Sequence, residues 1–266
     1  MIAAIGHVSR DIVGGGPPRP GGTVFYSSRA LARLGARARI GVSCAAVDKP
    51  SLIAPLEAFG LPVTWHESVS TTAYSFRYDP TGRRSMRQDA VGDPWSPGDA
   101  VRAVGDARWI HVGALVRTDF PRETLAALAA DDQMLLVDGQ GLVRTPELGP
   151  LRTNGDIGDV LRYVTILKLD LEEARSLTGD ADPERLRLLG VAEVILTLGS
   201  QGSVVVTPDA IVGVDAMEIA GRVDPTGAGD TFSAGYLVAR AAGANPVEAA
   251  RAATEAVAAF LGPAHA

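Results

Sequence analysis

The chain has 266 residues and a formal net charge of −6, with 25 basic and 31 acidic side chains. An acidic chain without a run of basic residues lacks the charge pattern of a nucleic-acid-binding protein, so we exclude nucleic acid as a partner. No apolar stretch approaches the length of a membrane-spanning helix, and the single cysteine, Cys44, excludes an intrachain disulfide and a cysteine-based zinc site. We therefore expect a cytoplasmic protein with no membrane partner.

Short apolar runs alternate with longer segments of helical period along the chain. This alternation indicates a mostly parallel sheet covered by helices on both faces. The predicted fold class is therefore α/β, with three α/β/α layers in a single domain over residues 1–266. We expect buried strands at 2–8, 38–43, 109–113, 134–138, 164–168 and 194–198, and helices at 25–34, 51–59, 122–130, 172–178, 183–189, 227–242 and 246–261.

Two regions break this alternation. Residues 14–22 are dense in glycine and proline, which predicts a turn-rich connection. Residues 62–67, 72–79 and 83–89 mix polar and apolar side chains around a turn at 79–82, a pattern typical of a hairpin with one exposed face. We expect these regions, about residues 10–24 and 66–91, to form a small, reduced β lid. The stretch 99–106 is interpreted as charged surface.

The strongest chemical signal is the segment 224–235, which begins Asp-Pro-Thr-Gly-Ala-Gly-Asp. Pro225 favours a turn, because the residue before a proline is kept out of the helical region. Gly227, Ala228 and Gly229 then enter a predicted helix with almost no side-chain bulk. Such an entry exposes unpaired backbone N–H groups at the positive end of the helix dipole, which predicts an anion site.

Asp230 lies within this anion site and has two interpretations. It caps the helix, as aspartate often does, or its carboxylate takes part in chemistry on the bound anion. The extended glycine-rich pattern favours the second interpretation. A Walker A loop is absent, and no Gly-x-Gly-x-x-Gly follows the first strand, so the pattern is not that of a P-loop or dinucleotide-binding protein.

Residues 224–235 resemble the C-terminal signature of the ribokinase/PfkB carbohydrate kinase family. The resemblance implies a ribokinase-like fold and transfer of the γ-phosphate of ATP to a hydroxyl group. It also implies site residues: Asp230 as the catalytic base, and Gly227, Ala228 and Gly229 as the anion hole for the transferred phosphoryl group.

Two N-terminal segments match the same family in order. Residues 6–11 resemble its first strand, which implies that Asp11 binds substrate hydroxyls. Gly21 and Gly22, followed by 30–35, resemble its di-glycine signature, where the substrate approaches the backbone. Taken alone, each segment has a plainer interpretation: Asp11 is an aspartate in a turn, and the two glycines form a tight loop. Their common order favours the family.

Two further segments carry the donor side of the resemblance. Residues 168–173 stand at the Asn-x-x-Glu motif, which implies that Asp170 and Glu173 organise Mg²⁺; the plainer interpretation is two acids at a helix start. Residues 197–202 resemble the turn that contacts the nucleotide in the family. The plainer interpretation of these residues is a turn between two strands. The implied nucleotide-binding residues are Thr197, Gly199, Gly202 and Thr226.

The chain departs from the family pattern at three places. Asp170 replaces the usual Asn, and Tyr26, Ser27 and Ser28 replace the segment that often contacts the substrate, so the substrate is not implied. The loop that supplies K⁺ ligands in some members looks truncated, which gives no support for activation by a monovalent cation. Residues 138–144 resemble the corresponding loop of plant inositol kinases, with a generic strand-to-helix loop as the alternative.

We therefore predict an ATP- and Mg²⁺-dependent kinase that phosphorylates a sugar or cyclitol, as a monomer or a homodimer. One alternative is a nucleoside kinase on the same scaffold, which the low aromatic content of 5% disfavours because few rings are present to stack on a base. Another is a catalytically silent sugar- or nucleotide-binding sensor. The intact Gly-Ala-Gly-Asp sequence disfavours that interpretation.

Overall fold

The computed structural model describes residues 1–78, 84–219 and 224–262. The turn expected at 79–82 lies outside these ranges. Within them, no helix has the length and apolar character that crossing a bilayer requires.

A nine-stranded sheet forms the centre of the described chain. Seven adjacent strands run parallel, and the last two, at one edge, pair antiparallel. In spatial order the strands are β14 (Ile211–Val214), β13 (Ser203–Val206), β12 (Glu193–Thr197), β11 (Ile166–Leu169), β9 (Met134–Asp138), β8 (Trp109–Gly113), β1 (Ile2–His7), β4 (Ala38–Cys44) and β5 (Val63–Glu67).

Helices cover both faces of this sheet, because successive side chains of a strand point to opposite faces. On β1, Ile2 and Ala4 belong to one buried cluster, whereas Ala3 and Ile5 belong to another. The first cluster packs against α1 (Thr23–Arg33), α2 (Lys49–Glu57), α8 (Ala228–Ala241) and α9 (Pro246–Leu261), and the second against α3 (Pro97–Val104), α4 (Arg122–Leu128), α5 (Gln140–Val143), α6 (Leu171–Thr178) and α7 (Pro183–Arg187).

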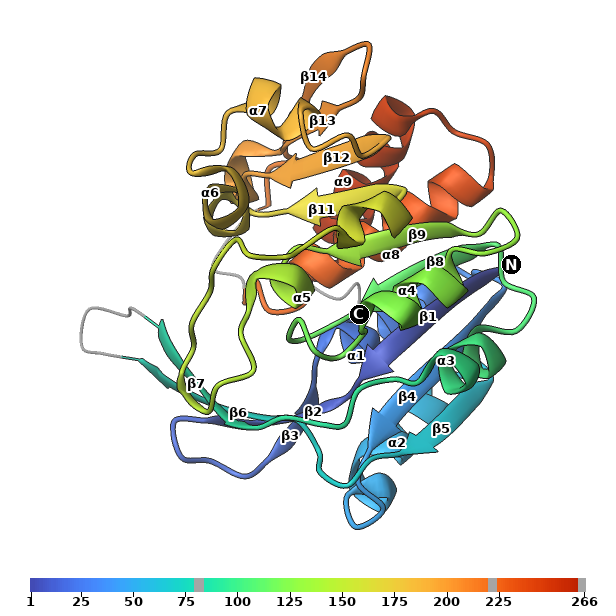
Figure 1. The fold of residues 1–266 in the computed structure, drawn as a ribbon, viewed down its shortest axis with the longest axis vertical. Helices are drawn as coiled ribbons and strands as arrows, with labels where there is room; N and C mark the ends of the chain where they lie inside the picture. Colours follow the sequence, from blue (N-terminus) through green and yellow to red (C-terminus); the bar gives the residue numbers. More distant parts are fainter. Residues whose placement is uncertain (79–83, 220–223, 263–266) are drawn as a thin grey trace.

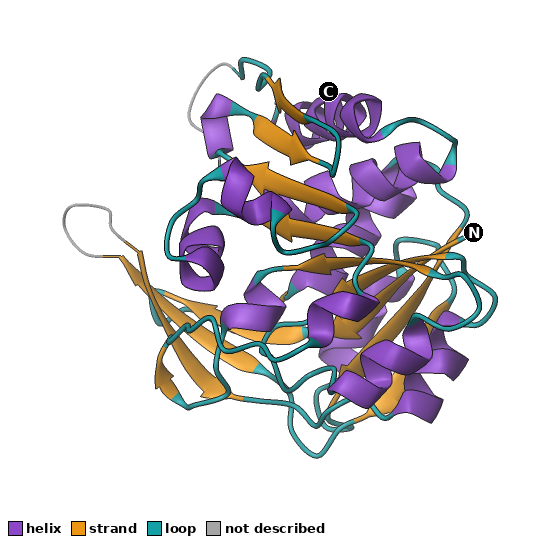
Figure 2. Ribbon diagram, turned by 45° about the horizontal axis from the view of Figure 1, so that its top comes forward, coloured by secondary structure: helices purple, strands orange, loops and turns teal. Residues whose placement is uncertain are grey.

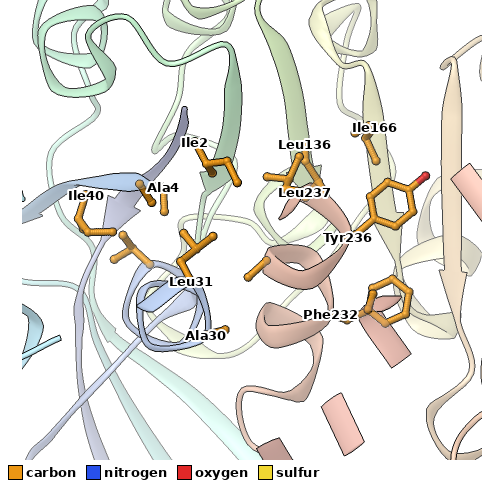
Figure 3. Close-up of a cluster of buried hydrophobic side chains, with 14 of the residues drawn as sticks. Ile2, Ala4, Ala30, Leu31, Ile40, Leu136, Ile166, Phe232, Tyr236 and Leu237 are labelled. Atoms are coloured by element: carbon orange, nitrogen blue, oxygen red, sulfur yellow. The ribbon is translucent and has the colours of Figure 1, made fainter. Parts of the chain in front are cut away.

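Figure 3 shows part of the first cluster, in which Leu31 of α1 and Leu237 of α8 face the sheet. Figure 2 shows helices on both sides of the strands. The predicted three-layer α/β/α arrangement with a mostly parallel sheet is confirmed.

A second, five-stranded sheet stands beside the carboxyl ends of the parallel strands (Figure 1). The chain passes from β1 into it at Val8, between the two sheets. Its strands, in order, are β10 (Gly149–Pro150), β7 (Arg84–Ala90), β6 (Ala73–Tyr78), β2 (Ser9–Val13) and β3 (Arg19–Gly21).

Three local predictions were wrong or incomplete. Residues 62–67 do not belong to the second sheet: β5 extends the main sheet beside β4, because Val63 and Trp65 pack against the first buried cluster. The stretch 99–106 is not bare surface, since α3 ends within it and buries Ala100 and Ala103. Strands β13 and β14 had no predicted counterpart.

Candidate active site

The glycine-rich entry to α8 is shaped by a close contact with α1. Gly227 has φ 82° in the left-handed region that favours glycine. A Cβ at this position would lie 2.4 Å from Cδ1 of Tyr26, so the aromatic ring rests directly on the Gly227 backbone. The chain can therefore turn sharply into α8. The backbone N–H of Ala228 donates to the backbone oxygen of Pro225 at 3.0 Å, so of the three predicted anion-hole residues Gly227 and Gly229 are the ones left to offer an N–H group to an anion.

Gly227→Ala is expected to lower the free energy of unfolding by about 2–4 kcal/mol, since both the left-handed φ and displacement of Tyr26 carry a cost. Gly243→Ala is the matched control: Gly243 has φ 98°, but a Cβ added to it would meet open space within 4 Å. That control should lose only about 1 kcal/mol. Urea unfolding of both variants measures the difference, and equal losses would contradict the contact with Tyr26.

Asp230 lies in the first turn of α8 and is half-buried. Burial raises the pKa of Asp230, the nearby negative charge of Asp138 raises it further, and Lys168 and His111 oppose both effects. The carboxylate therefore stands between a positive and a negative neighbour beside the anion hole.

A buried polar cluster lies behind Asp230, at the carboxyl ends of three adjacent strands, β8, β9 and β11. The carboxylate of Asp138 contacts Nε2 of His111 at 2.5 Å and Nζ of Lys168 at 2.7 Å, and Oγ of Ser233 donates to it at 2.9 Å. Burial opposes the charge on Asp138, but Lys168 and His111 outweigh burial and lower its pKa. Asp138 is therefore held in its ionised form, and the positive charge of Lys168 compensates its negative charge.

Lys168 brings a positive charge to the anion hole. A Cβ at Gly229 would lie 3.0 Å from its Nζ, so the ammonium group faces the glycine backbone. Burial works against the charge on Lys168, yet Asp138, Glu173 and Asp230 outweigh burial and raise its pKa. A permanently charged ammonium group at this point favours a bound polyphosphate.

Asp11, Gly21 and Gly22, the predicted substrate-binding residues, lie together in the structure. Asp11 is 7% exposed and accepts a hydrogen bond from Oγ of Ser9 at 2.7 Å. A Cβ at Gly21 would lie 2.1 Å from Oδ2 of Asp11, and one at Gly22 would lie 2.8 Å from a backbone oxygen of β1. The di-glycine thus lets β3 lie directly against the carboxylate.

Tyr26 connects this group to Asp230. Burial raises the pKa of its hydroxyl group, and the charges of Asp11 and Asp230 both add to the increase. One side chain thus lies within electrostatic reach of the predicted acceptor residue and the predicted base.

A cavity of about 560 Å³ adjoins the anion hole at Ala228 and Gly229. Three of the four predicted nucleotide residues, Thr197, Gly199 and Gly202, line it together with Ala228 and Gly229. Its remaining wall is mostly apolar and includes Ala216, Met217, Ile219, Pro225, Phe232, Val257, Ala258 and Leu261.

Thr226, the fourth predicted nucleotide residue, does not line this cavity. Its backbone N–H and hydroxyl group both bond to Oδ1 of Asp224, at 3.0 and 2.6 Å. Together with Arg19, Tyr26 and Arg29, it lines a separate cavity of about 360 Å³. The hydrogen-bond partner of the threonine therefore comes from its own turn.

Asp170 and Glu173 form a capping box at the start of α6. The backbone N–H of Asp170 donates to Oε2 of Glu173 at 2.9 Å, and that of Glu173 donates to Oδ1 of Asp170 at 2.8 Å. The plainer interpretation, acids at a helix start, therefore describes this geometry. Burial and the charge of Asp170 raise the pKa of Glu173 to about 7, although Lys168 opposes them.

These two carboxylates suit Mg²⁺, which takes one or two carboxylate ligands together with phosphate oxygens and water. Each has a second oxygen that the capping box does not engage. In the described part of the chain no group of three or more His, Cys, Asp or Glu side chains gathers as a metal site. A cation here would therefore need oxygens from the phosphate donor.

Comparison with known proteins decides the family. A family model described as pfkB family carbohydrate kinase matches residues 19–262. The chain belongs to the pfkB family. As a member of this family of carbohydrate kinases, the protein is a phosphotransferase whose acceptor is an alcohol group.

Individual relatives of this pfkB-family protein differ in substrate. A 2-dehydro-3-deoxygluconokinase of Thermoproteus tenax is 41% identical over 86 residues, which are 30% of this chain and only 26% of that relative. A solved pyrophosphate-dependent kinase of the ribokinase family, complexed with a pyrophosphate analogue and myo-inositol, is 26% identical with a TM-score of 0.85, covering 98% of this chain and 95% of that one. A Burkholderia thailandensis nucleoside kinase with inosine is 18% identical with a TM-score of 0.75, covering 99% and 92%, and shows the fold alone.

Sequence reasoning gave no role to five side chains of this pfkB-family site: Thr23, His111, Asp138, Gln140 and Lys168. It did single out the segments 138–144 and 168–173, which contain three of them. Two signals could have found some of them, since Asp138 ends a predicted strand and Lys168 directly precedes the Asp170 motif. Carboxyl ends of neighbouring parallel strands meet at one edge of a sheet. Which strands are neighbours, however, is not visible in the sequence.

Proposed function

We propose that this pfkB-family protein transfers the γ-phosphate of ATP to a hydroxyl group of a sugar or cyclitol, with Asp230 as general base. One observation carries the proposal: the Asp230 carboxylate stands at the glycine-lined start of α8, where the ammonium group of Lys168 faces the Gly229 backbone. We assign Lys168 to the donor side and Asp11 to the acceptor side. In this proposal residues 1–266 are one domain, and the second sheet is the lid over the acceptor.

The proposed transfer needs a base with an oriented acceptor, groups that stabilise the negative charge of the phosphoryl group, and ligands for Mg²⁺. Asp230 accepts the proton of the attacking hydroxyl group, while Asp11 binds a neighbouring hydroxyl group and orients the acceptor. Backbone N–H groups at 227–229 and the ammonium group of Lys168 stabilise the negative charge of the phosphoryl group in transit. Asp170 and Glu173 would hold Mg²⁺, which when bound neutralises oxygens of the donor.

The 560 Å³ cavity supports ATP as donor. It has the size and apolar wall that a purine and its ribose need, and it opens onto the anion hole. Pyrophosphate is a second candidate for the phosphate donor. The solved kinase that matches 98% of this chain is pyrophosphate-dependent. A donor without a nucleoside would leave the apolar cavity without an occupant.

Initial rates with ATP and with pyrophosphate, each with Mg²⁺, test this assignment against a panel of myo-inositol, hexoses and nucleosides. Turnover is expected with ATP and a sugar or cyclitol. Ala258→Phe should fill the cavity and raise the KM for ATP at least about tenfold, whereas Ala259→Phe, an exposed neighbour outside the cavity, should not.

Three results would contradict the proposal. Turnover with pyrophosphate alone, unaffected by Ala258→Phe, would make the donor pyrophosphate and the cavity irrelevant to it. Binding of sugars or ATP without turnover of any pair in the panel would favour the silent sensor, and turnover confined to nucleosides would favour the nucleoside kinase.

A further inference from the structure

Two arginines, Arg19 of β3 and Arg29 of α1, line the cavity of about 360 Å³ that also contains Thr226. Among the described residues, neither guanidinium group forms an ion pair. Nε of Arg29 is buried, and no group in the described part of the chain accepts a hydrogen bond from it. Because buried polar groups of native proteins are normally hydrogen-bonded, this nitrogen indicates a partner from outside the described chain.

Two aromatic rings hold the guanidinium group of Arg29 in place. Its Cζ lies 4.4 Å from the centre of the Phe260 ring and 5.4 Å from that of the Tyr26 ring. Ring faces attract the cation, but they do not serve as acceptors for the N–H groups in its plane. Burial lowers the pKa of Arg29, and the positive charge of Arg33 lowers it further, so a negative charge beside Arg29 would be stabilised.

The charged groups of the cavity wall favour an anion. Besides the two arginines, the one other charged residue in the wall is Asp224, whose Oδ1 accepts hydrogen bonds from the backbone N–H and the hydroxyl group of Thr226. Two positive charges therefore stand against one negative charge. A guanidinium group offers paired N–H donors whose spacing matches the oxygens of a carboxylate or a phosphate.

This cavity lies beside the predicted acceptor residues. Arg19 stands directly opposite Asp11 in the register of β3 and β2, so the two side chains share one face of the second sheet. Tyr26, which also lines the cavity, rests on the Gly227 backbone at the entry to α8. The cavity assigned to the donor is a different one, lined by Ala228 and Gly229.

We propose that the 360 Å³ cavity binds an oxyanion group, carboxylate or phosphate, carried by the acceptor, so that the preferred acceptor is an acidic sugar or cyclitol. Arg29 is the fixed contact and Arg19 of the second sheet is the contact that reaches the acceptor from the other side. The proposal rests on the proposed function for the reaction that the acceptor undergoes, whereas anion binding by the cavity is measured without any reaction.

Calorimetry tests the binding step. Gluconate, glucose 6-phosphate and myo-inositol 1-phosphate are compared with glucose and myo-inositol, and inorganic phosphate and acetate serve as free anions. At least one acidic probe is expected to bind about tenfold more tightly than its neutral parent, and Arg29→Gln and Arg19→Gln should each remove this gain. Arg33→Gln is the matched control and should keep the gain, because Arg33 is exposed and lies 5.9 Å from the same Phe260 ring but does not line the cavity.

Initial rates test the acceptor. The ratio of kcat/KM for the acidic acceptor to kcat/KM for its neutral parent should fall about tenfold in Arg29→Gln and in Arg19→Gln, and should hold in Arg33→Gln. Thermal unfolding confirms that each variant is folded, and Arg19 is exposed, so its replacement leaves the core untouched.

Two results would overturn this proposal: acidic probes that bind no more tightly than their neutral parents, and a preference for acidic probes that survives both Arg29→Gln and Arg19→Gln. Binding of inorganic phosphate through Arg29 without any gain for the acidic sugars would likewise overturn it, since the ligand would then be a free anion. Acidic sugars that bind through Arg29 but accept no phosphoryl group from ATP or pyrophosphate would instead overturn the proposed function and leave the anion site standing.

Discussion

Asp230→Asn is expected to lower kcat by about 10²–10⁴-fold, the usual contribution of a positioned general base. An asparagine side chain has nearly the size and shape of an aspartate side chain, so it should keep the place of Asp230 in the first turn of α8. What is lost is the ability to take a proton from the acceptor. Steady-state kinetics with the best pair of the donor and acceptor panel measures the loss.

Two controls separate this chemical loss from damage to the site. Calorimetry should find ATP bound to Asp230→Asn about as tightly as to the wild type, and urea unfolding should find no loss of stability. Removal of a half-buried charge that faces Asp138 should, if anything, stabilise the fold. Turnover near the wild-type level in a folded Asp230→Asn protein would defeat the assignment of the base.

Lys168→Gln is expected to lower kcat by about 10²–10³-fold, as the loss of one fixed stabiliser of transition-state charge does elsewhere. The ammonium group faces the Gly229 backbone, where the phosphoryl group is proposed to pass, and glutamine offers a neutral donor in its place. The chain contains one other lysine, Lys49. Its ammonium group lies 3.9 Å from the centre of the Trp65 ring, so Lys49→Gln is the matched control and should leave kcat unchanged.

The same substitution has a structural cost that must be separated from catalysis. Lys168 compensates the buried charge of Asp138, so Lys168→Gln should lower the free energy of unfolding by about 1–3 kcal/mol. The double variant Lys168→Gln/Asp138→Asn removes the uncompensated charge and should recover part of this stability without recovering kcat. Recovery of both together would show that Lys168 acts only through the fold.

Much of the fold could be predicted because its signals are local. The apolar period of α9 over Pro246–Leu261 and the β-branched runs of the central strands identify their own secondary structure. Residues 62–67 misled the prediction because an edge strand such as β5 is polar on its open side and therefore resembles a lid strand. What distinguishes β5 from a lid strand is its pairing with β4, which the sequence of the segment does not reveal.

The candidate site divides in the same way. The glycines at 227 and 229 and the di-glycine at 21–22 act through their own backbone, so short motifs were sufficient to identify the two loops and the aspartate that we propose as the base.

Two features depended on the tertiary structure: the cluster of His111, Asp138 and Lys168, and the hydrogen bond from Gln140 to Thr23. Their members are far apart in sequence and meet because β8, β9 and β11 are adjacent and α1 lies against the start of α8. Strand order and helix packing are set by burial of the whole apolar surface, a property that no single segment carries. The sequence alone thus determined which backbone can bind an anion and which carboxylate stands within it, and the tertiary structure decided which charges surround that carboxylate.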